Sequence, residues 1–188
     1  WIALLDHDDV MRPHALFEVA RTINQHPTAE LIYSDEDKID GEGQRFDAFF
    51  KPDFSIEMFR SQNYFNHLTV QRTANVRAVG GWQEGFEGSQ DYDLNLRIIE
   101  RIEPRNICHI PKILYHWRAV AGSTAADGAE KSYAWEAGRH ALEAHMKRLG
   151  IAGHVEETVG TPFYRLRLTA PDPEPLVSLI VPTRDGLK

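Results

Sequence analysis

The chain has 188 residues, enough for one domain of ordinary size and short for two. Apolar residues make up 42% and charged residues 26%, a composition typical of globular proteins that excludes long disorder. The net charge of −7 without a Lys/Arg-rich block argues against a nucleic-acid partner, and the one cysteine, Cys108, fits a reducing compartment and excludes a cysteine-rich zinc site.

The first third of the chain predicts a strand, a helix and a second strand. Residues 1–5 are an apolar run typical of a buried strand, and a helix is expected over 13–25, because a proline opens it and His26-Pro27 ends it. The apolar face of this helix is expected to consist of Leu16, Val19, Ala20 and Ile23. Residues 31–34 predict a short strand that enters an acidic loop at 35–42.

The middle of the chain is expected to contain fewer regular elements. Residues 45–66 are rich in aromatic side chains without a clear period, so this segment is predicted to be irregular. Residues 68–70 predict a strand, and 73–79 a short helix closed by a glycine pair. A further amphipathic helix is expected from about residue 90 to residue 102.

The last third predicts two short strands, at 107–110 and 113–115, and then a long amphipathic helix over 127–149. A hairpin follows, with strands at 154–159 and 163–169. The histidines of the long helix are predicted to lie at the surface, namely His140 and His145. Strands that alternate with helices place the chain in the α/β class.

The composition near the C-terminus predicts the domain organisation. A Pro- and acid-rich stretch at 170–175 indicates a stiff extended linker, and an apolar run follows it. We therefore expect residues 1–150 to hold most of one domain, 151–175 a hairpin and linker, and 176–188 the first strand of a second domain. On this expectation the chain is a piece of a longer protein.

An acidic turn follows the first predicted strand. Asp6 and Asp8 stand two residues apart at a strand end, where open α/β folds bind ligands, so both carboxylates can reach one cation. Hard divalent ions such as Mg²⁺ or Mn²⁺ take oxygen ligands and bridge carboxylates to substrate phosphates. The alternative is that Asp8 or Asp9 caps the helix that follows.

The second acidic segment, 35–42, has two open interpretations. It fails the calcium-loop pattern of EF-hands, because a loop started at Asp35 has Ile39 at the fifth position and Asp40, not glycine, at the sixth. The segment is either a solvated turn or a secondary group beside a substrate.

Three later residues carry further polar chemistry. Asp91 opens a helix, where it is either a cap or a general base that takes a proton from a hydroxyl. His116 can complete a carboxylate metal site, although a lone histidine on a strand is more often structural. Arg118 can pair with phosphate oxygens, which the N–H groups of the small-residue loop 121–124 can also cradle.

Together these segments resemble the family 2 glycosyltransferases, inverting enzymes with the GT-A fold. Residues 3–9 look like that family's strand and DXD motif, and 90–97 resembles its acidic motif at the start of the base-bearing helix. The segments 33–38 and 115–118 look like a bacterial branch that acts on surface polysaccharides. The resemblance covers roughly residues 1–125 and rests on several motifs in order.

The resemblance implies a donor side and a metal. Asp8 and His116 would bind a Mn²⁺ or Mg²⁺ ion that bridges the diphosphate of the donor. Asp6 would lie at the ribose or the metal, and Arg118 would contact the phosphates.

The resemblance also implies a base and an acceptor side. Asp91 would deprotonate the acceptor hydroxyl. Trp82, in a Gly-Gly-Trp motif, and Gln90 would belong to the acceptor-sugar pocket, although the family often has glutamate at the position of Gln90. The aromatic rings of residues 46–65 either line the acceptor side or belong to the core.

The implied function is inverting transfer of a sugar from a UDP-, GDP- or dTDP-linked donor to a glycan or lipid-linked glycan. The GT-A fold would be partial, with its N-terminal nucleotide-binding half missing, so the fragment alone is expected to be inactive. The alternative is a catalytically silent glycan- or partner-binding module of a tandem glycosyltransferase, and a metal-dependent phosphohydrolase is a weaker third. We expect a cytoplasmic location, either free or peripheral at the inner face of the plasma membrane, because nucleotide-sugars are made in the cytoplasm and no export signal is visible in the sequence. No apolar run approaches the roughly 18 to 20 residues of a membrane span.

Overall fold

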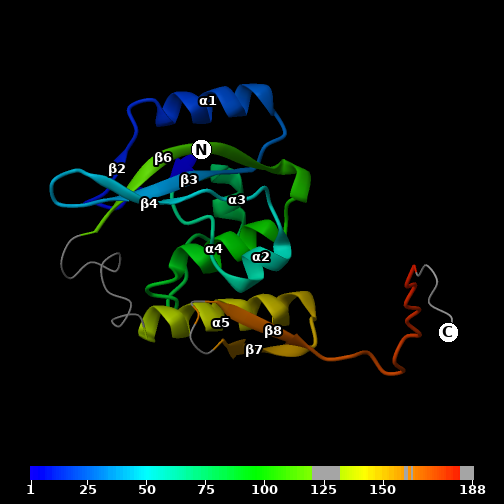
Figure 1. Ribbon diagram of the computed structural model, residues 1–188. Helices are drawn as coiled ribbons and strands as arrows, with labels where there is room; N and C mark the ends of the chain where they lie inside the picture. Colours follow the sequence, from blue (N-terminus) through cyan, green and yellow to red (C-terminus); the bar gives the residue numbers. More distant parts are fainter. Residues whose placement is uncertain (120–131, 159–160, 162, 183–188) are drawn as a thin grey trace.

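Residues 1–119, 132–158, 161 and 163–182 are described by a computed structural model (Figure 1). The described chain is a mixed α/β structure in layers, with α1 over one face of a sheet and the other helices on the opposite side. The helices are α1 (Ala15–Gln25), α2 (Ile56–Ser61), α3 (Thr73–Ala78), α4 (Gln90–Ile99), α5 (Ser132–Leu149) and a 3-10 turn at Pro104–Asn106. The α/β class predicted from the sequence is confirmed, and the GT-A topology stays a prediction.

The main sheet is mixed. Its strands are β1 (Ile2–Ala3), β2 (Val10–Met11), β3 (Leu31–Ile39), β4 (Arg45–Phe49), β5 (Thr69–Gln71) and β6 (Ile107–Arg118). In the described chain they follow the order β1-β5-β3-β6-β2, and β4 also pairs with β3. β3 and β6 run parallel, whereas the other pairs are antiparallel. The predicted hairpin forms from β7 (Gly153–Glu157) and β8 (Tyr164–Leu168) and contacts α5 and α2.

The strand β3 is central because it pairs on both sides and is covered on both faces. Its side chains alternate, so Ile32 packs beneath α1 while Leu31 and Tyr33 pack toward α4. Strands buried on both faces can be apolar throughout, and β3 is apolar only in its first half. Its second half contains acidic residues that the sequence pattern predicted to lie in a loop.

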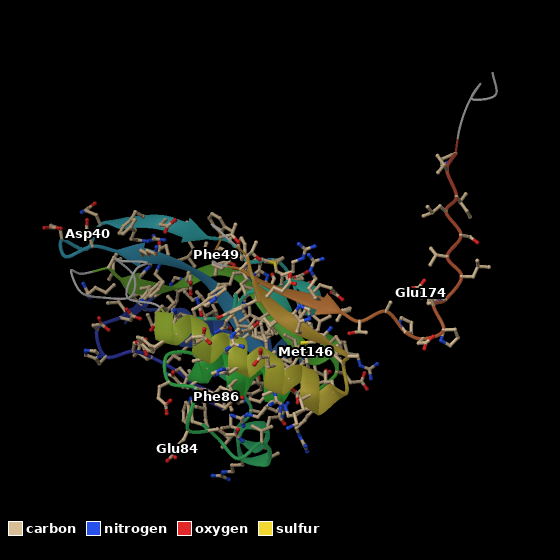
Figure 2. All side chains as sticks on the ribbon, turned by 90° about the horizontal axis from the view of Figure 1, so that it is seen from below. Asp40, Phe49, Glu84, Phe86, Met146 and Glu174 are labelled. Atoms are coloured by element: carbon tan, nitrogen blue, oxygen red, sulfur yellow. The ribbon has the colours of Figure 1, made fainter. Side chains whose placement is uncertain are left out.

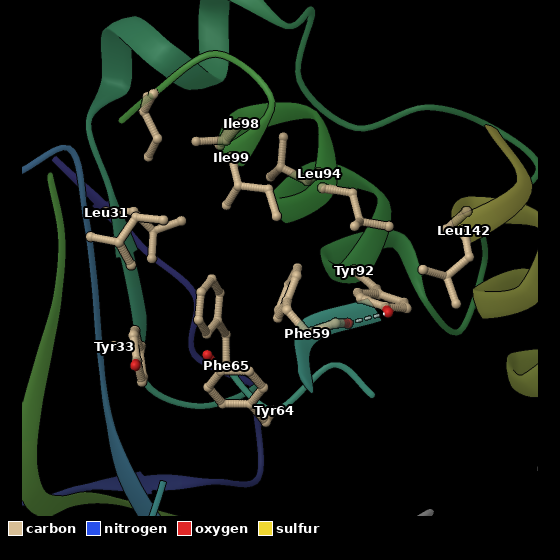
Figure 3. Packing of buried hydrophobic residues seen from close by; sticks show 14 of the residues in the cluster. Leu31, Tyr33, Phe59, Tyr64, Phe65, Tyr92, Leu94, Ile98, Ile99 and Leu142 are labelled. Atoms are coloured by element: carbon tan, nitrogen blue, oxygen red, sulfur yellow. Dashed lines mark hydrogen bonds between the residues drawn. The ribbon is translucent and has the colours of Figure 1, made fainter. Parts of the chain in front are cut away.

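Two hydrophobic clusters fill the faces of the sheet. The larger lies between the sheet, α4 and α5, where Phe65 packs against Tyr33 and Phe59 with ring centroids 4.4 and 4.2 Å apart (Figure 3). Tyr92 of α4 donates a hydrogen bond to the carbonyl of Phe59, as Figure 3 shows. Of the two interpretations of the aromatic segment, the core interpretation is therefore confirmed for Phe59, Tyr64 and Phe65.

The buried face of α1 differs from the prediction. Val19 is buried as expected, whereas Leu16 and Ala20 are exposed. Glu18 takes part of the buried face instead, because its carboxylate accepts a hydrogen bond from Lys112 of β6 at 2.7 Å. A periodicity that counts only apolar residues cannot anticipate a charged side chain whose partner comes from a distant strand.

The solvated-turn interpretation of the second acidic segment, 35–42, agrees with the structure only for residues 40–42, which lead from β3 into β4. Residues 35–39 form the second half of β3, and their acidic side chains are buried. Asp35 accepts a hydrogen bond from the backbone N–H of Lys51 at 2.9 Å, and Asp37 accepts one from Nε of Arg45 at 2.6 Å. Arg45 lies in β4 and Lys51 in the segment after it. The pairing of β4 with β3 therefore provides the hydrogen-bond donors that the buried carboxylates need.

Two other predictions are corrected in the same way. The segment 45–66 is not irregular throughout, because it contains β4 and α2. The short strands predicted at 107–110 and 113–115 are one strand, β6, which follows β3 along its length with irregularities in register. The bulges keep the two parts of β6 in one ladder where the sequence pattern is broken by Pro111.

One of the two histidines predicted at the surface of α5 is buried. His145 is 1% exposed, with Nδ1 2.7 Å from a carboxylate oxygen of Glu100 and Nε2 accepting a hydrogen bond from Arg60. His140 is exposed as predicted. Glu100 follows α4 and Arg60 belongs to α2, so His145 joins three helices into one packed layer.

Residues 169–182 contain no helix or strand and lead away from the rest of the structure (Figures 1 and 2). Their extended course agrees with the linker predicted at 170–175. The assignment of 1–150, 151–175 and 176–188 to separate units stays a prediction. The loop 121–124, the start of the helix predicted over 127–149 and residues 183–188 lie outside the described residues.

Candidate functional site

A cavity of about 680 Å³ lies where the chain segments before β5, after β1 and at the start of α4 and α5 meet. Its lining includes acidic, imidazole and aromatic side chains, namely Asp6, His67, Trp82, Asp91, Trp117 and Tyr133. Carboxylates, one imidazole and large aromatic rings thus face the same space. Lys and Arg side chains are absent from the lining formed by the described residues.

Three potential metal ligands converge at this cavity. One ligand atom each of Asp6, Asp9 and His67 lies within 4.8 Å of the other two. Asp6 and Asp9 come from the acidic turn after β1, and His67 comes from the segment before β5, which pairs with β1. Two carboxylates and an imidazole are a donor set that suits Mn²⁺ or Mg²⁺, so the residues present fit a divalent cation.

Tyr115 of β6 joins the members of this group. Its hydroxyl donates a hydrogen bond to Asp9 at 2.6 Å and accepts one from the backbone N–H of Asp6 at 3.2 Å. Its ring stacks on the imidazole of His67, with centroids 4.6 Å apart. The motif 115–118 drew attention to His116 and Arg118, whereas the residue that holds the group together is the tyrosine before them.

The sequence pattern does not single out His67 as a site residue. Its position in the structure is determined by two buried charged side chains, those of Glu36 and Lys51. Glu36 of β3 accepts a hydrogen bond from the backbone N–H of His67 at 3.0 Å, and the same carboxylate lies 3.3 Å from Nδ1 of the ring. Lys51 donates to the backbone carbonyls of His67 and Phe65, at 2.5 and 2.8 Å. A Glu–Lys pair inside the protein therefore fixes the backbone that carries the imidazole.

The protonation states of this group depend on one another. Burial lowers the pKa of Lys51, and the adjacent Glu36 carboxylate offsets part of that effect. Burial raises the pKa of Glu36, but the charge of Lys51 and the hydrogen bonds and charge of His67 together outweigh that effect, so the pKa of Glu36 lies below its usual value. Burial also lowers the pKa of His67, but the contact with Glu36 and the charges of Glu36 and Asp91 together outweigh that effect, so the pKa of His67 lies above its usual value.

Asp91 lies in the cavity at the first turn of α4. The side-chain amide of Asn63 donates a hydrogen bond to its carboxylate at 2.6 Å. Burial raises the pKa of Asp91, against the lowering effects of His67 and of the bond from Asn63. A carboxylate whose pKa is raised in a cavity is a stronger base than an ordinary aspartate, which suits proton abstraction.

The predicted metal ligands Asp8 and His116 do not belong to the converging group. The carboxylate of Asp8 lies 3.7 Å from the ring of exposed His7. His116 is 6% exposed, and its Nδ1 contacts the carboxylate of Asp37 on β3. Metal binding by Asp8 and His116 stays a prediction, and the group of Asp6, Asp9 and His67 is an alternative set of ligands.

Arg118, the predicted phosphate contact, ties the acidic turn to the end of β6. Its backbone N–H donates to the carboxylate of Asp9 at 2.7 Å, and its Nε donates to the carbonyl of Asp8 at 2.6 Å. The guanidinium therefore already has a structural partner. Its contact with a donor phosphate stays a prediction.

Trp82 and Gln90, the predicted acceptor residues, both line the cavity. Trp82 is 50% exposed and belongs to the loop between α3 and α4. Arg97 of α4 holds that loop, because its guanidinium donates to the carbonyls of Val79 and Gly81 at 2.7 and 2.8 Å. Their contact with a sugar stays a prediction.

The described chain is therefore a mixed α/β structure with an acidic and aromatic cavity. No family model matches the chain. It is 50% identical over all 188 residues to y4gI, an uncharacterized protein of Sinorhizobium fredii, of which it covers 21%. It is 40% identical over 186 residues to the O-antigen biosynthesis protein RfbC of Myxococcus xanthus, and the match covers 98% of this chain and 14% of RfbC. The chain thus spans a small part of the length of these curated relatives.

Among the described residues, no helix combines the length and the apolar character needed to cross a membrane.

Replacing Lys51 with methionine should destabilise the protein by about 3–5 kcal/mol, because Glu36 would remain charged and buried without its partner. Urea unfolding measures the change. Lys38→Met is the matched control, since Lys38 pairs with Asp47, which is 62% exposed. Exposed pairs contribute about 0–1 kcal/mol, so equal losses in the two variants would contradict the role given to Lys51.

Replacing Asp91 with asparagine should raise the midpoint of thermal unfolding near neutral pH. The folded state raises the pKa of Asp91, so the stability that this group contributes is lost as the pH rises through the raised value. The gain should fade on acidification toward the ordinary aspartate pKa. A shift of about 2–4 °C corresponds to about 1 kcal/mol in a protein of this size. A variant that melts lower than wild type at neutral pH would show instead that the negative charge of Asp91 stabilises the first turn of α4.

Proposed function

We propose that the chain is part of an inverting glycosyltransferase with a GT-A fold that takes part in bacterial polysaccharide biosynthesis. The observation that carries the proposal is the cavity lined by Asp6, His67, Trp82 and Asp91, where Asp9 completes the group of potential metal ligands. The name of RfbC, an O-antigen biosynthesis protein, supports the same biosynthetic class. The donor would be a nucleotide-diphosphate-sugar and the acceptor a glycan or a lipid-linked glycan.

The reaction needs a base for the acceptor and charge neutralisation for the donor. Asp91 would take the proton of the acceptor hydroxyl while the hydroxyl oxygen attacks the anomeric carbon. The bond from that carbon to the donor diphosphate breaks in the same displacement, so the configuration inverts. Asn63 would orient the carboxylate of Asp91, since its amide donates to it at 2.6 Å.

The donor side requires a cation. A diphosphate placed in a cavity lined by carboxylates would be repelled unless positive charge accompanied it. Asp6, Asp9 and His67 would hold Mn²⁺ or Mg²⁺, which supplies Lewis-acid stabilisation of the departing diphosphate when bound. Asp9 would be kept in place by Tyr115 and Arg118, whose hydrogen bonds fix both oxygens of its carboxylate.

Mn²⁺ binding distinguishes the two candidate ligand sets. Asp6→Asn should weaken Mn²⁺ binding by about tenfold or more, because a charged ligand of the converging group is lost. Asp8→Asn is the matched control, as Asp8 lies in the same turn and outside the group. Paramagnetic relaxation of water protons measures Mn²⁺ bound to each protein. The opposite result, with binding lost in Asp8→Asn alone, would favour the set predicted from the sequence.

Sugar transfer is measured on a full-length protein that contains this chain, since the relatives are several times longer. Release of nucleoside diphosphate from UDP-, GDP- and dTDP-sugars should require Mn²⁺ or Mg²⁺ and a glycan acceptor. Asp91→Asn should lower the rate by about 100- to 10,000-fold. The rate should fall on acidification at a pH above the ordinary range of aspartate, because the base is then protonated. Glycan binding without transfer, in a folded protein that contains the nucleotide-binding half, would favour the silent binding module instead.

A further inference from the structure

A second, smaller cavity adjoins the first across the side chain of Trp82. It measures about 360 Å³, and Trp82, Gly88 and Gln90 line both cavities. The smaller cavity is otherwise lined by Gln83, Glu84 and Glu87, from the loop that leads into α4. Because these three residues line both cavities, the two spaces are neighbours, and a ligand must be longer than one sugar ring to reach from one into the other.

The close approach of α5 to this loop creates the shared wall. Gly88 has a φ of +90°, and a Cβ at its position would lie 2.5 Å from the ring of Tyr133 and 3.0 Å from Ala134. Only glycine allows the loop and the first turn of α5 to meet there without strain. The turn before it is fixed as well, since Glu87 accepts a hydrogen bond from the backbone N–H of Gly85 at 3.0 Å.

The chemistry of the smaller cavity indicates what it would bind. Trp82 offers a half-exposed ring face, on which the apolar face of a sugar ring can pack. Gln83 and Glu84 are exposed side chains with oxygens that accept hydrogen bonds from sugar hydroxyls. Glu84 lies at the outer edge of this loop, which Figure 2 shows at the periphery of the molecule.

The charge of the smaller cavity excludes one class of sugars. Glu84 and Glu87 line it, and the bond from Gly85 lowers the pKa of Glu87, so this carboxylate stays ionised at neutral pH. Among the residues that the structure describes, the lining contains no Lys, Arg or His side chain. A uronic acid or a phosphorylated sugar would meet like charges without compensation, whereas neutral sugars and amino sugars would not.

We propose that the smaller cavity is a second acceptor subsite, which takes the penultimate sugar of a neutral or amino-sugar glycan. The inference rests on the proposed function, because it assumes that the terminal sugar lies beside Asp91 in the larger cavity. The acceptor would therefore be a growing glycan of at least two sugars. Trp82 would separate the two rings, and Glu84 would select against anionic residues.

The test uses an array of defined mono-, di- and trisaccharides that carry neutral, amino or anionic sugars. The protein should bind neutral or amino glycans of two or more sugars and should bind the corresponding single sugars at least about tenfold more weakly. Trp82→Ala should lower the affinity for disaccharides by about tenfold, which corresponds to about 1.4 kcal/mol. Phe50→Ala is the matched control, because Phe50 is an exposed ring outside both linings.

Reversing the charge of Glu84 tests separately whether this residue excludes anionic sugars. Glu84→Lys should let the protein bind glycans with uronic acids, whereas Glu42→Lys, an exposed change in the turn between β3 and β4, should not. Binding of anionic glycans by the wild type, equal binding of single sugars and disaccharides, or no glycan bound by the folded protein would overturn the subsite.

The outcomes separate this inference from the proposed function. Transfer with Mn²⁺ to single sugars and to disaccharides at equal rates would leave the transferase standing and remove the subsite. The expected glycan pattern without nucleotide release from any donor would leave the subsite standing and remove the transferase.

Discussion

The rest of the site depends on the ammonium group of Lys51, which is enclosed by the protein. Its side chain is 0% exposed, and it donates to the Glu36 carboxylate and to two backbone carbonyls of the segment before β5. Burying a charged group costs free energy unless each of its donors has an acceptor. The ammonium group of Lys51 therefore requires the Glu36 carboxylate and both carbonyls to lie around it. That arrangement brings β3 and the His67 backbone together, and it places an imidazole at the cavity.

The two halves of β3 have different roles, since the first packs in the hydrophobic core and the second forms ionic contacts around the cavity. Leu31 and Tyr33 belong to the larger hydrophobic cluster, whereas Asp35, Glu36 and Asp37 take partners from neighbouring segments. Hydrophobic burial anchors the strand, and the ionic partners then determine how the segments around the cavity are oriented. The arrangement explains why a run of acidic residues lies inside a sheet, where unpaired carboxylates would be strongly destabilising.

The cavity is acidic on both sides of Trp82, and this constrains any ligand. A phosphorylated donor needs a cation near Asp6, Asp9 and His67, whereas a neutral acceptor needs none near Glu84 and Asp91. The proposed donor therefore belongs beside the cation ligands, and the proposed acceptor beside Trp82 and Asp91. The aromatic rings of Trp82 and Trp117 supply contact area that does not depend on charge, as sugar rings require.

The sequence alone determined the α/β class, most helices, the hairpin and the acidic turn after the first strand, because local periodicity and turn residues specify these features. It also predicted Asp6, Trp82, Gln90 and Asp91, which the fold brings to one cavity. Only the tertiary structure decided that residues 35–39 are a buried strand, that His67 and Tyr115 lie beside Asp6 and Asp9, and that Asp8 is outside this converging group. Burial and pairing of charged groups depend on partners far along the chain, and a local pattern carries no information about them.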